Sequence, residues 1–206
     1  MTTNKLPLYL DNPNYTLYGN LGERIAAGLL DGVFLAPATV IMMYFNSMHL
    51  YNFYYTFVIS QLIILGYYLY LPVRYGATPG KRVMGLTILK LDGSAISYRE
   101  AFLKHLPMVI MGLFAFVVQS FAMASADATT FNSLSWMEQS KYLQSVSTFP
   151  SWIQLTIIYS FYLGNLLLVW QNSRSRSISD LVAGTVVVYT RCLEKIEEYK
   201  TKEEEL

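Results

Sequence analysis

The chain has 206 residues and a formal net charge of +1, and hydrophobic residues make up 53% of it. Only 14% of the residues are charged, whereas soluble globular domains contain about 25%. This composition argues against an ordinary soluble domain, and no feature of the sequence suggests binding to nucleic acid.

Four runs are nearly free of charge, and each is about 20 residues long, which is enough for a helix to cross about 30 Å of hydrocarbon. The runs comprise residues 25–44, 53–73, 106–126 and 152–171. We therefore expect an all-α membrane protein with four transmembrane helices.

Basic residues predict how these helices are oriented. Of the 15 lysines and arginines, only Lys141 falls in the loops that follow the first and third runs. Because basic residues accumulate in cytoplasmic loops, we expect both termini and the middle loop on the cytoplasmic side. Cys192 is the single cysteine, which excludes an intrachain disulfide, and the first 20 residues lack the pattern of a cleaved signal peptide.

Polar residues divide the chain into three parts. Residues 1–20 are an irregular N-terminal segment, residues 21–191 are the membrane domain, and residues 192–206 are an acidic tail, expected as a frayed helix. Within the membrane domain, residues 83–91 alternate like a strand and residues 185–190 are β-branched, so the two stretches can pair. We expect this two-stranded β pair in a small cytoplasmic cap.

Two capping-box patterns mark the starts of helices. The patterns are Ser97 with Glu100 and Ser177 with Asp180. The first predicts a short amphipathic helix that ends near His105 and lies on the membrane surface before the third span. The second predicts a helix that ends at Gly184. A further short helix is expected around residues 136–146, in the external segment after the third span.

The charges in or beside the first and last spans are the most informative. They are Arg24, Asp31, Arg176 and Asp180. A carboxylate at the centre of a spanning helix costs roughly 2.5–3.5 kcal/mol, so Asp31 should have a partner or a function. Arg24 can reach Asp31 only by extending inward, whereas Arg176 and Asp180 can pair along one helix turn. Two nearby carboxylates resist ionising together, which suits proton or cation exchange. A structural ion-pair network, or binding of lipid or a partner, explains the same residues.

The turn Gly76–Lys81 superficially resembles a phosphate-binding loop. It is one residue short, and Arg82 stands where Ser or Thr would bind magnesium, so we reject nucleotide binding. Lys81 and Arg82 are instead candidates for contacts with anionic lipid head groups, and simple anchoring by positive charge is the alternative.

Uncharged polar residues inside the spans are Gln61, Gln119 and Asn165. Interhelical hydrogen bonds are their commoner role, and an ion path is the alternative. Tyr67, Tyr68 and Tyr70 are expected in an aromatic interface belt. His49 and His105 have no Cys or carboxylate at metal-ligand spacing, so no metal site is expected, and no catalytic motif is visible.

Three sequence blocks resemble the RDD family of bacterial membrane proteins, which is named for one arginine and two aspartates. The blocks are Arg24–Asp31, then Gly76–Lys81 with Gly85–Leu86 and Asp92–Gly93, and finally Arg176–Thr185. Arg24, Asp31 and Asp180 match the three residues that name the family. Near the end of the helix before the third span, where the family commonly has an arginine, this chain has Lys104 and His105.

The resemblance implies a multi-pass protein of the bacterial cytoplasmic (inner) membrane, and some members are thought to exchange alkali cations for protons. Under that hypothesis Asp31 would hold the proton or a cation such as Na⁺, Asp180 would be its relay, and Arg24 and Arg176 would tune both. The alternative is a non-transporting scaffold or a subunit of a larger complex. Both hypotheses expect no enzyme activity and no cofactor, with lipids and a homo-oligomer or membrane complex as partners.

Overall fold

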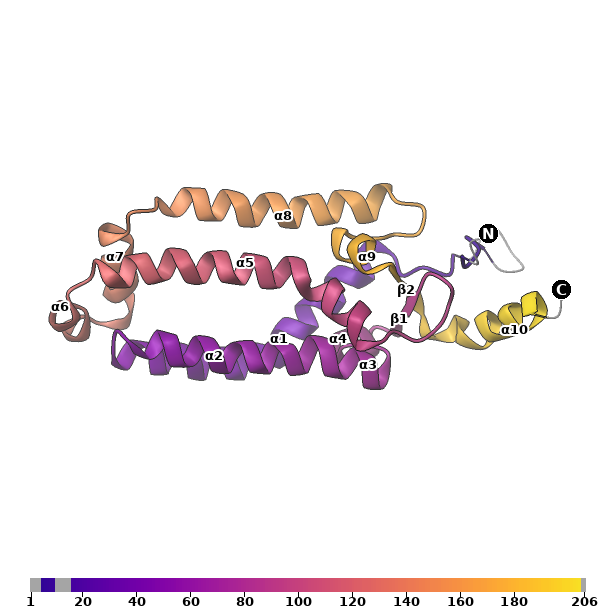
Figure 1. Cartoon of the computed structure of the whole chain (residues 1–206), viewed down its shortest axis with the longest axis horizontal. Coiled ribbons are helices and arrows are strands. Elements are labelled where there is room, and N and C mark those ends of the chain that lie inside the picture. The colour runs from indigo at the N-terminus through magenta and orange to yellow at the C-terminus, as the bar shows by residue number, and fades with distance from the viewer. Residues whose placement is uncertain (1–4, 10–15, 205–206) are drawn as a thin grey trace. The chain divides into compact units, whose positions relative to one another are not determined.

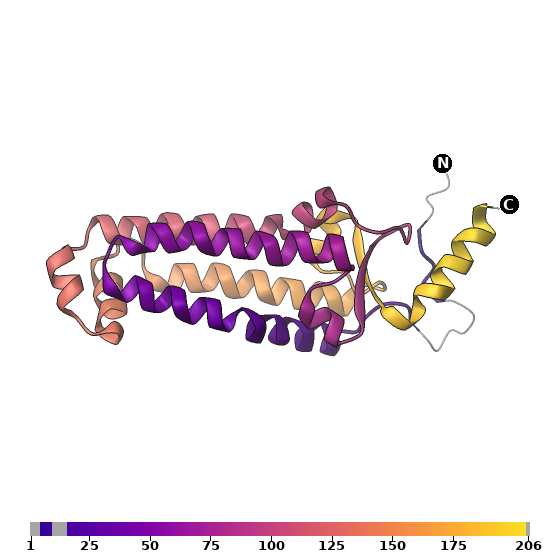
Figure 2. The same ribbon diagram turned by 90° about the horizontal axis from the view of Figure 1, so that it is seen from below.

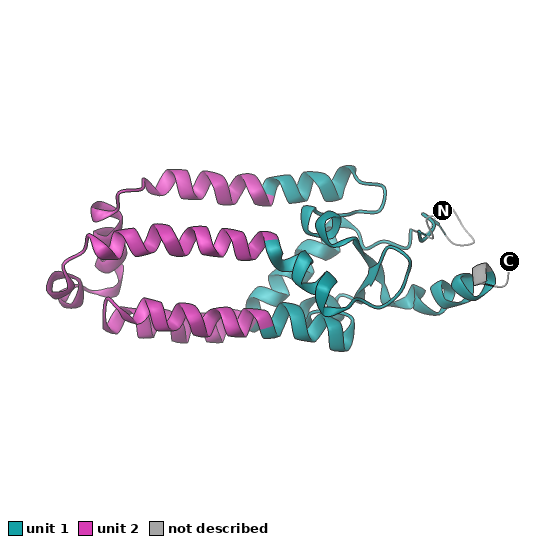
Figure 3. Cartoon of the chain, viewed as in Figure 1, with its two compact units in different colours: residues 1–34, 66–106, 163–206 teal, residues 35–65, 107–162 magenta. Residues whose placement is uncertain are grey.

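The computed structural model of the protein describes residues 5–9 and 16–204. Residues 1–4, 10–15 and 205–206, which belong to the expected N-terminal segment and acidic tail, lie outside the described residues. The chain divides into two compact units (Figure 3). Unit 1 comprises residues 1–34, 66–106 and 163–206, and unit 2 comprises residues 35–65 and 107–162.

The described residues contain four helices that are long and apolar enough to cross a membrane, as the sequence predicts (Figure 1). They are α1 (Leu21–Met48), the segment Asn52–Tyr75, α5 (Tyr98–Ala124) and α8 (Ser151–Gln171). Their outer side chains are apolar and uncovered: Leu29, Tyr55 and Trp170 expose 69–73% of their surface. Such exposure on long apolar helices fits a lipid surrounding rather than water.

The second spanning segment is built from three pieces. They are α2 (Asn52–Leu65), the π-helix η1 (Gly66–Tyr70) and α3 (Leu71–Tyr75). A π-helical turn is rare and is found frequently at functional sites. It belongs to unit 1, together with α3, which ends at Gly76 in the left-handed conformation.

The prediction of a separate short surface helix that ends near His105 is wrong. Ser97 and Glu100 do form the predicted start, with the Ser97 amide donating to Glu100 Oε2 at 2.8 Å, but α5 then continues to Ala124 as one helix. Pro107 lies inside it. A proline removes one backbone donor, yet membrane helices tolerate this because neighbouring groups satisfy the freed carbonyl.

The cap in unit 1 contains the predicted strand pair. Strand β1 (Leu86–Lys90) pairs antiparallel with β2 (Thr185–Tyr189), with Leu86 opposite Tyr189. The chain just before α1 extends this pairing, because the Gly19 amide donates to the Val187 carbonyl at 3.0 Å.

Both ends of the described chain enter the core of the cap. The core cluster comprises Leu6, Leu17, Tyr18, Leu89, Val186, Val188 and Ile196. After β2 the chain passes through η2 (Thr190–Cys192) into α10 (Leu193–Glu204), as Figure 2 shows. The tail is therefore a packed helix where a frayed one was expected, because Ile196 is buried with Tyr18 and Val188.

Unit 2 includes two short helices between α5 and α8. They are α6 (Ala128–Ser133) and α7 (Trp136–Val146), and α7 has the predicted bounds. The Gln139 side chain donates to the Ser47 carbonyl at 2.9 Å and so ties α7 to the end of α1. A small core of Leu50, Met123 and Phe131 lies beside this contact.

Candidate functional site

Asp31 and Asp180 are both buried in unit 1, with 2% and 0% of their surface exposed. An ionised carboxylate is stable in such a place only when hydrogen bonds and positive charges replace water. Each aspartate has its own set of partners, and the two sets differ in kind.

Asp31 accepts hydrogen bonds from three neutral groups. Its Oδ1 accepts from the Tyr67 hydroxyl and from the Gly80 amide, both at 2.7 Å, and its Oδ2 accepts from the Thr78 hydroxyl at 2.7 Å. The Gly80 amide lies in the first turn of α4 (Pro79–Val83), whose N-cap residue Thr78 makes no capping bond of its own. Asp31 thus caps α4 from another helix.

Gly80 is required at this contact by its size. A Cβ at residue 80 would lie 2.2 Å from the Ala27 carbonyl oxygen and 2.6 Å from Asp31 Oδ1. Only glycine lets the turn approach α1 closely enough for its amide to reach Asp31.

Lys81 supplies the positive charge beside Asp31. Its Nζ lies 3.7 Å from Asp31 Oδ2 and 3.3 Å from Thr78 Oγ1, and 19% of the side chain is exposed. Burial lowers the pKa of Lys81 from 10.5 to about 8, although the charge of Asp31 acts to raise it. Lys81 therefore forms an internal ion pair, and its expected head-group contact stays a prediction. Arg82 is exposed, with its guanidinium over the Tyr75 ring, and its head-group contact stays a prediction.

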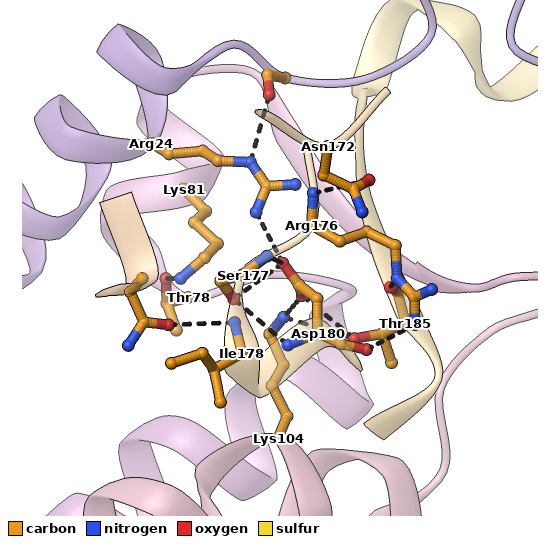
Figure 4. A network of polar contacts seen from close by, with 12 residues as sticks. Arg24, Thr78, Lys81, Lys104, Asn172, Arg176, Ser177, Ile178, Asp180 and Thr185 are labelled. Carbon is orange, nitrogen blue, oxygen red and sulfur yellow. Dashed lines mark hydrogen bonds and ion pairs between the residues drawn. The ribbon is translucent and has the colours of Figure 1, made fainter. Parts of the chain in front are cut away.

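Asp180 is held by two cations (Figure 4). It lies in the first turn of α9 (Ile178–Ala183), where the Ser177 amide and hydroxyl donate to Oδ2 at 3.1 and 3.0 Å in the predicted capping box. Arg24 Nη1 donates to Oδ2 at 2.7 Å, and Lys104 Nζ contacts Oδ1. Burial alone would raise the pKa of Asp180, but Lys104 and Arg24 outweigh it and hold that pKa far below its usual range.

Two of the predicted pairings are wrong. Arg24 binds Asp180 and not Asp31. Arg176 does not pair with the Asp180 carboxylate: its guanidinium donates to the backbone carbonyls of Thr185 and Asp180, at 3.1 and 3.0 Å. The capping box explains this second difference, because it turns the carboxylate toward the start of α9 and leaves the carbonyl for Arg176.

Four residues of the site were not predicted as such from the sequence: Tyr67, Thr78, Gly80 and Lys104. Tyr67 was expected in an aromatic belt, but its hydroxyl points at Asp31. In the sequence, Lys104 was noted only because it stands near the position where the RDD family commonly has an arginine. The turn containing Thr78 and Gly80 was recognised, but its hydrogen bonds to Asp31 were not predicted.

Of the polar residues in the spans, Asn165 caps α9, because its side-chain oxygen accepts from the Ile178 amide at 3.2 Å. Gln119 lines a cavity of about 580 Å³ in unit 2, together with Phe116 and Gln154. Within residues 5–9 and 16–204, no group of three or more His, Cys, Asp or Glu is placed to hold a metal ion.

Comparison with known proteins finds a family match over the part of the chain that contains both buried aspartates. A family model described as RDD family matches residues 18–184. The matched region contains Arg24, Asp31 and Asp180, while the cap residues Leu6 and Ile196 lie outside it. No curated protein matches the chain. The match covers well over half of the chain, which is therefore a membrane protein that belongs to the RDD family.

Proposed function

We propose that the protein exchanges a monovalent cation for a proton at the Asp31–Lys81 pair. Asp31 lies within a candidate spanning helix, and the Lys81 ammonium lies near two oxygen atoms, Asp31 Oδ2 and Thr78 Oγ1. Oxygen atoms of this kind are ligands for hard monovalent and divalent cations. In the exchange, an alkali cation takes the place of the ammonium, and Lys81 releases its proton to water as it becomes a neutral amine.

Charge balance supports this route. The groups whose charges act on Lys81 are Asp31, Lys104, Asp180 and Arg24. Replacing one ammonium proton by one monovalent cation leaves the total charge of this buried region unchanged, so no new desolvation penalty arises. Exposure of 19% and a pKa of about 8 keep the Lys81 proton exchangeable near neutral pH.

Asp180 has a different role in this proposal. Its contacts with Arg24 and Lys104, together with its lowered pKa, favour a carboxylate that stays ionised. We therefore assign proton and cation exchange to Asp31 and Lys81, and we assign to Asp180 the role of a fixed anchor. The proposal places the protein in the bacterial inner membrane as a homo-oligomer without cofactor, because four helices leave little room for an enclosed path within one chain.

The test is cation-dependent proton movement in proteoliposomes that contain the full chain and a pH-sensitive dye. A pulse of Na⁺ or K⁺ should release protons, and the apparent cation affinity should rise about tenfold between pH 7 and pH 9, as Lys81 loses its proton. Lys81→Gln should abolish the pH dependence of cation binding while leaving Asp31 in place.

The matched control is Lys90→Gln. Lys90 also lies 3.7 Å from a carboxylate, that of Glu100, but it is outside the Asp31 site. Its replacement should leave the exchange unchanged. Wild-type vesicles that release no protons after a cation pulse at any pH would refute the exchange function.

A scaffold role in a membrane complex is the second candidate. The observation that favours it is that each carboxylate joins several elements: Asp31 joins α1, η1 and α4, and Asp180 joins α1, α5 and α9. A scaffold predicts stoichiometric partner proteins after purification in mild detergent, and their loss when α10 is deleted.

A further inference from the structure

One nitrogen of the Arg24 guanidinium is left without a partner. Nε donates to the Gly19 carbonyl at 3.2 Å and Nη1 donates to Asp180, but Nη2 is buried and unbonded. Among the described residues it is the one buried side-chain nitrogen or oxygen without a hydrogen bond. A buried charged donor in this state is costly, and native proteins normally satisfy such groups with a protein group, water or a bound ligand.

The surrounding charges favour a negative ligand. The side chains that contact Asp180 carry three positive charges against its one negative charge, an excess of two positive charges. They are Arg24, Lys104 and Arg176. Like charges raise each other's energy in a poorly hydrated region, so a bound anion would lower the energy of the whole group.

The position of Arg24 indicates where the anion comes from. Arg24 is in the first turn of α1, at the end of a candidate spanning helix, and 11% of its side chain is exposed. Lipid phosphates are found at this depth of a membrane. Arginine suits a phosphate contact, because its guanidinium stays charged and its planar donors match phosphate oxygens.

We infer that Arg24 Nη2 binds a phosphate group, which lowers the excess of positive charge around Asp180. The anion and Asp180 bind different nitrogens of one guanidinium, so a bound phosphate does not compete with the Arg24–Asp180 pair (Figure 4). This inference does not depend on the exchange function, because it concerns an anion at Arg24 and not a cation at Asp31.

The test uses detergent-solubilised full-length protein and its thermal unfolding at constant ionic strength. Phosphatidylglycerol should raise the melting temperature more than phosphatidylcholine, whose choline cancels the phosphate charge. Millimolar inorganic phosphate distinguishes the sources: stabilisation by phosphate alone indicates a free-phosphate site, and stabilisation by phosphatidylglycerol alone indicates a lipid head group. If neither anion stabilises the wild type beyond the phosphatidylcholine control, the inference is wrong.

Variants localise the effect. Arg24→Lys removes Nη2 but keeps one positive charge near Asp180, so the apparent affinity for the anion should fall about tenfold, the effect of one charge-assisted hydrogen bond. Arg191→Lys is the matched control, because Arg191 is an exposed arginine of the same unit whose guanidinium lies over the Tyr189 ring. Equal losses in the two variants would mean diffuse surface attraction and overturn the assignment.

Native mass spectrometry of the wild type covers the case in which Arg24→Lys does not fold. One phosphatidylglycerol molecule should remain bound to each chain at collision energies that remove phosphatidylcholine. Equal retention of the two lipids would also overturn the inference.

Discussion

Asp31 and Asp180 are both buried carboxylates, but they are stabilised by different kinds of partner. Asp31 is stabilised mainly by neutral donors, a tyrosine, a threonine and a backbone amide, with a lysine at 3.7 Å. Asp180 is stabilised by direct contacts with Arg24 and Lys104. Hydrogen bonds from neutral groups satisfy a carboxylate without fixing its counter-charge. We therefore expect the positive charge beside Asp31 to be replaceable and the two charges on Asp180 to be fixed.

The largest effect on stability is expected from removing the charge of Asp180. Asp180→Asn leaves Arg24 and Lys104 buried without their counter-charge, which should cost about 3–5 kcal/mol of unfolding free energy. Asp31→Asn should cost less, because Lys81, with a pKa of about 8, can become neutral. Thermal unfolding of the two variants at pH 7 measures this. Equal losses would show that the two sites do not differ in this way.

The next effect concerns the approach of α4 to Asp31. Gly80→Ala places a methyl group against the Ala27 carbonyl. We therefore expect destabilisation of about 1–3 kcal/mol and loss of the hydrogen bond from the residue-80 amide to Asp31. Gly28→Ala is the control: nothing lies within 4 Å of a Cβ at that helical position, so it should be neutral or slightly stabilising. A tolerated Gly80→Ala would mean that the close packing of α4 on α1 is not needed.

The third prediction uses pH. The pKa of Lys81 is lower in the folded protein, about 8, than the ordinary value of 10.5. Between these two values the unfolded chain binds more protons than the folded chain, so stability should rise as pH increases from about 8 to 10.5. Lys81→Gln should flatten this part of the stability profile, measured by thermal unfolding across pH, and Lys90→Gln should not.

The smallest effect is expected at the start of α9. Ser177→Ala removes a cap and one donor to Asp180, while both cations stay in contact with the carboxylate, so the loss should be about 1 kcal/mol. A loss near that of Asp180→Asn would show that the capping box, and not the cations, holds the carboxylate.

Local sequence patterns predicted local structure well. The apolar runs indicated the spans, alternation and β-branching indicated β1 and β2, and the Ser177–Asp180 box indicated the start of α9. The buried aspartates were identified because charge in an apolar helix needs an explanation. These signals lie within a few residues of each other, so they can be seen in one chain.

Partner choice at the site could not be predicted, because it depends on contacts between distant segments. Pairing along the chain suggested Arg176 for Asp180, whereas the structure uses Arg24 and Lys104, which lie 156 and 76 positions away. Tyr67 reaches Asp31 from a π-helical turn, which has no sequence signal here. The sequence identified Arg24, Asp31, Arg176 and Asp180 as a cluster, but it indicated neither the role of Lys104 nor which residues are in contact.

The separation of Arg24 from Asp180 also orders events during synthesis. The ribosome makes Arg24 early and adds Asp180 156 residues later, which corresponds to roughly 8–30 s at typical elongation rates. Lys104 follows Arg24 but still precedes Asp180 by 76 residues, so both cations are made well before their carboxylate partner in α9. The closing of α9 onto α1 and α5 is therefore possible only late in synthesis, and a chain that stops before Asp180 carries two cations without their carboxylate partner.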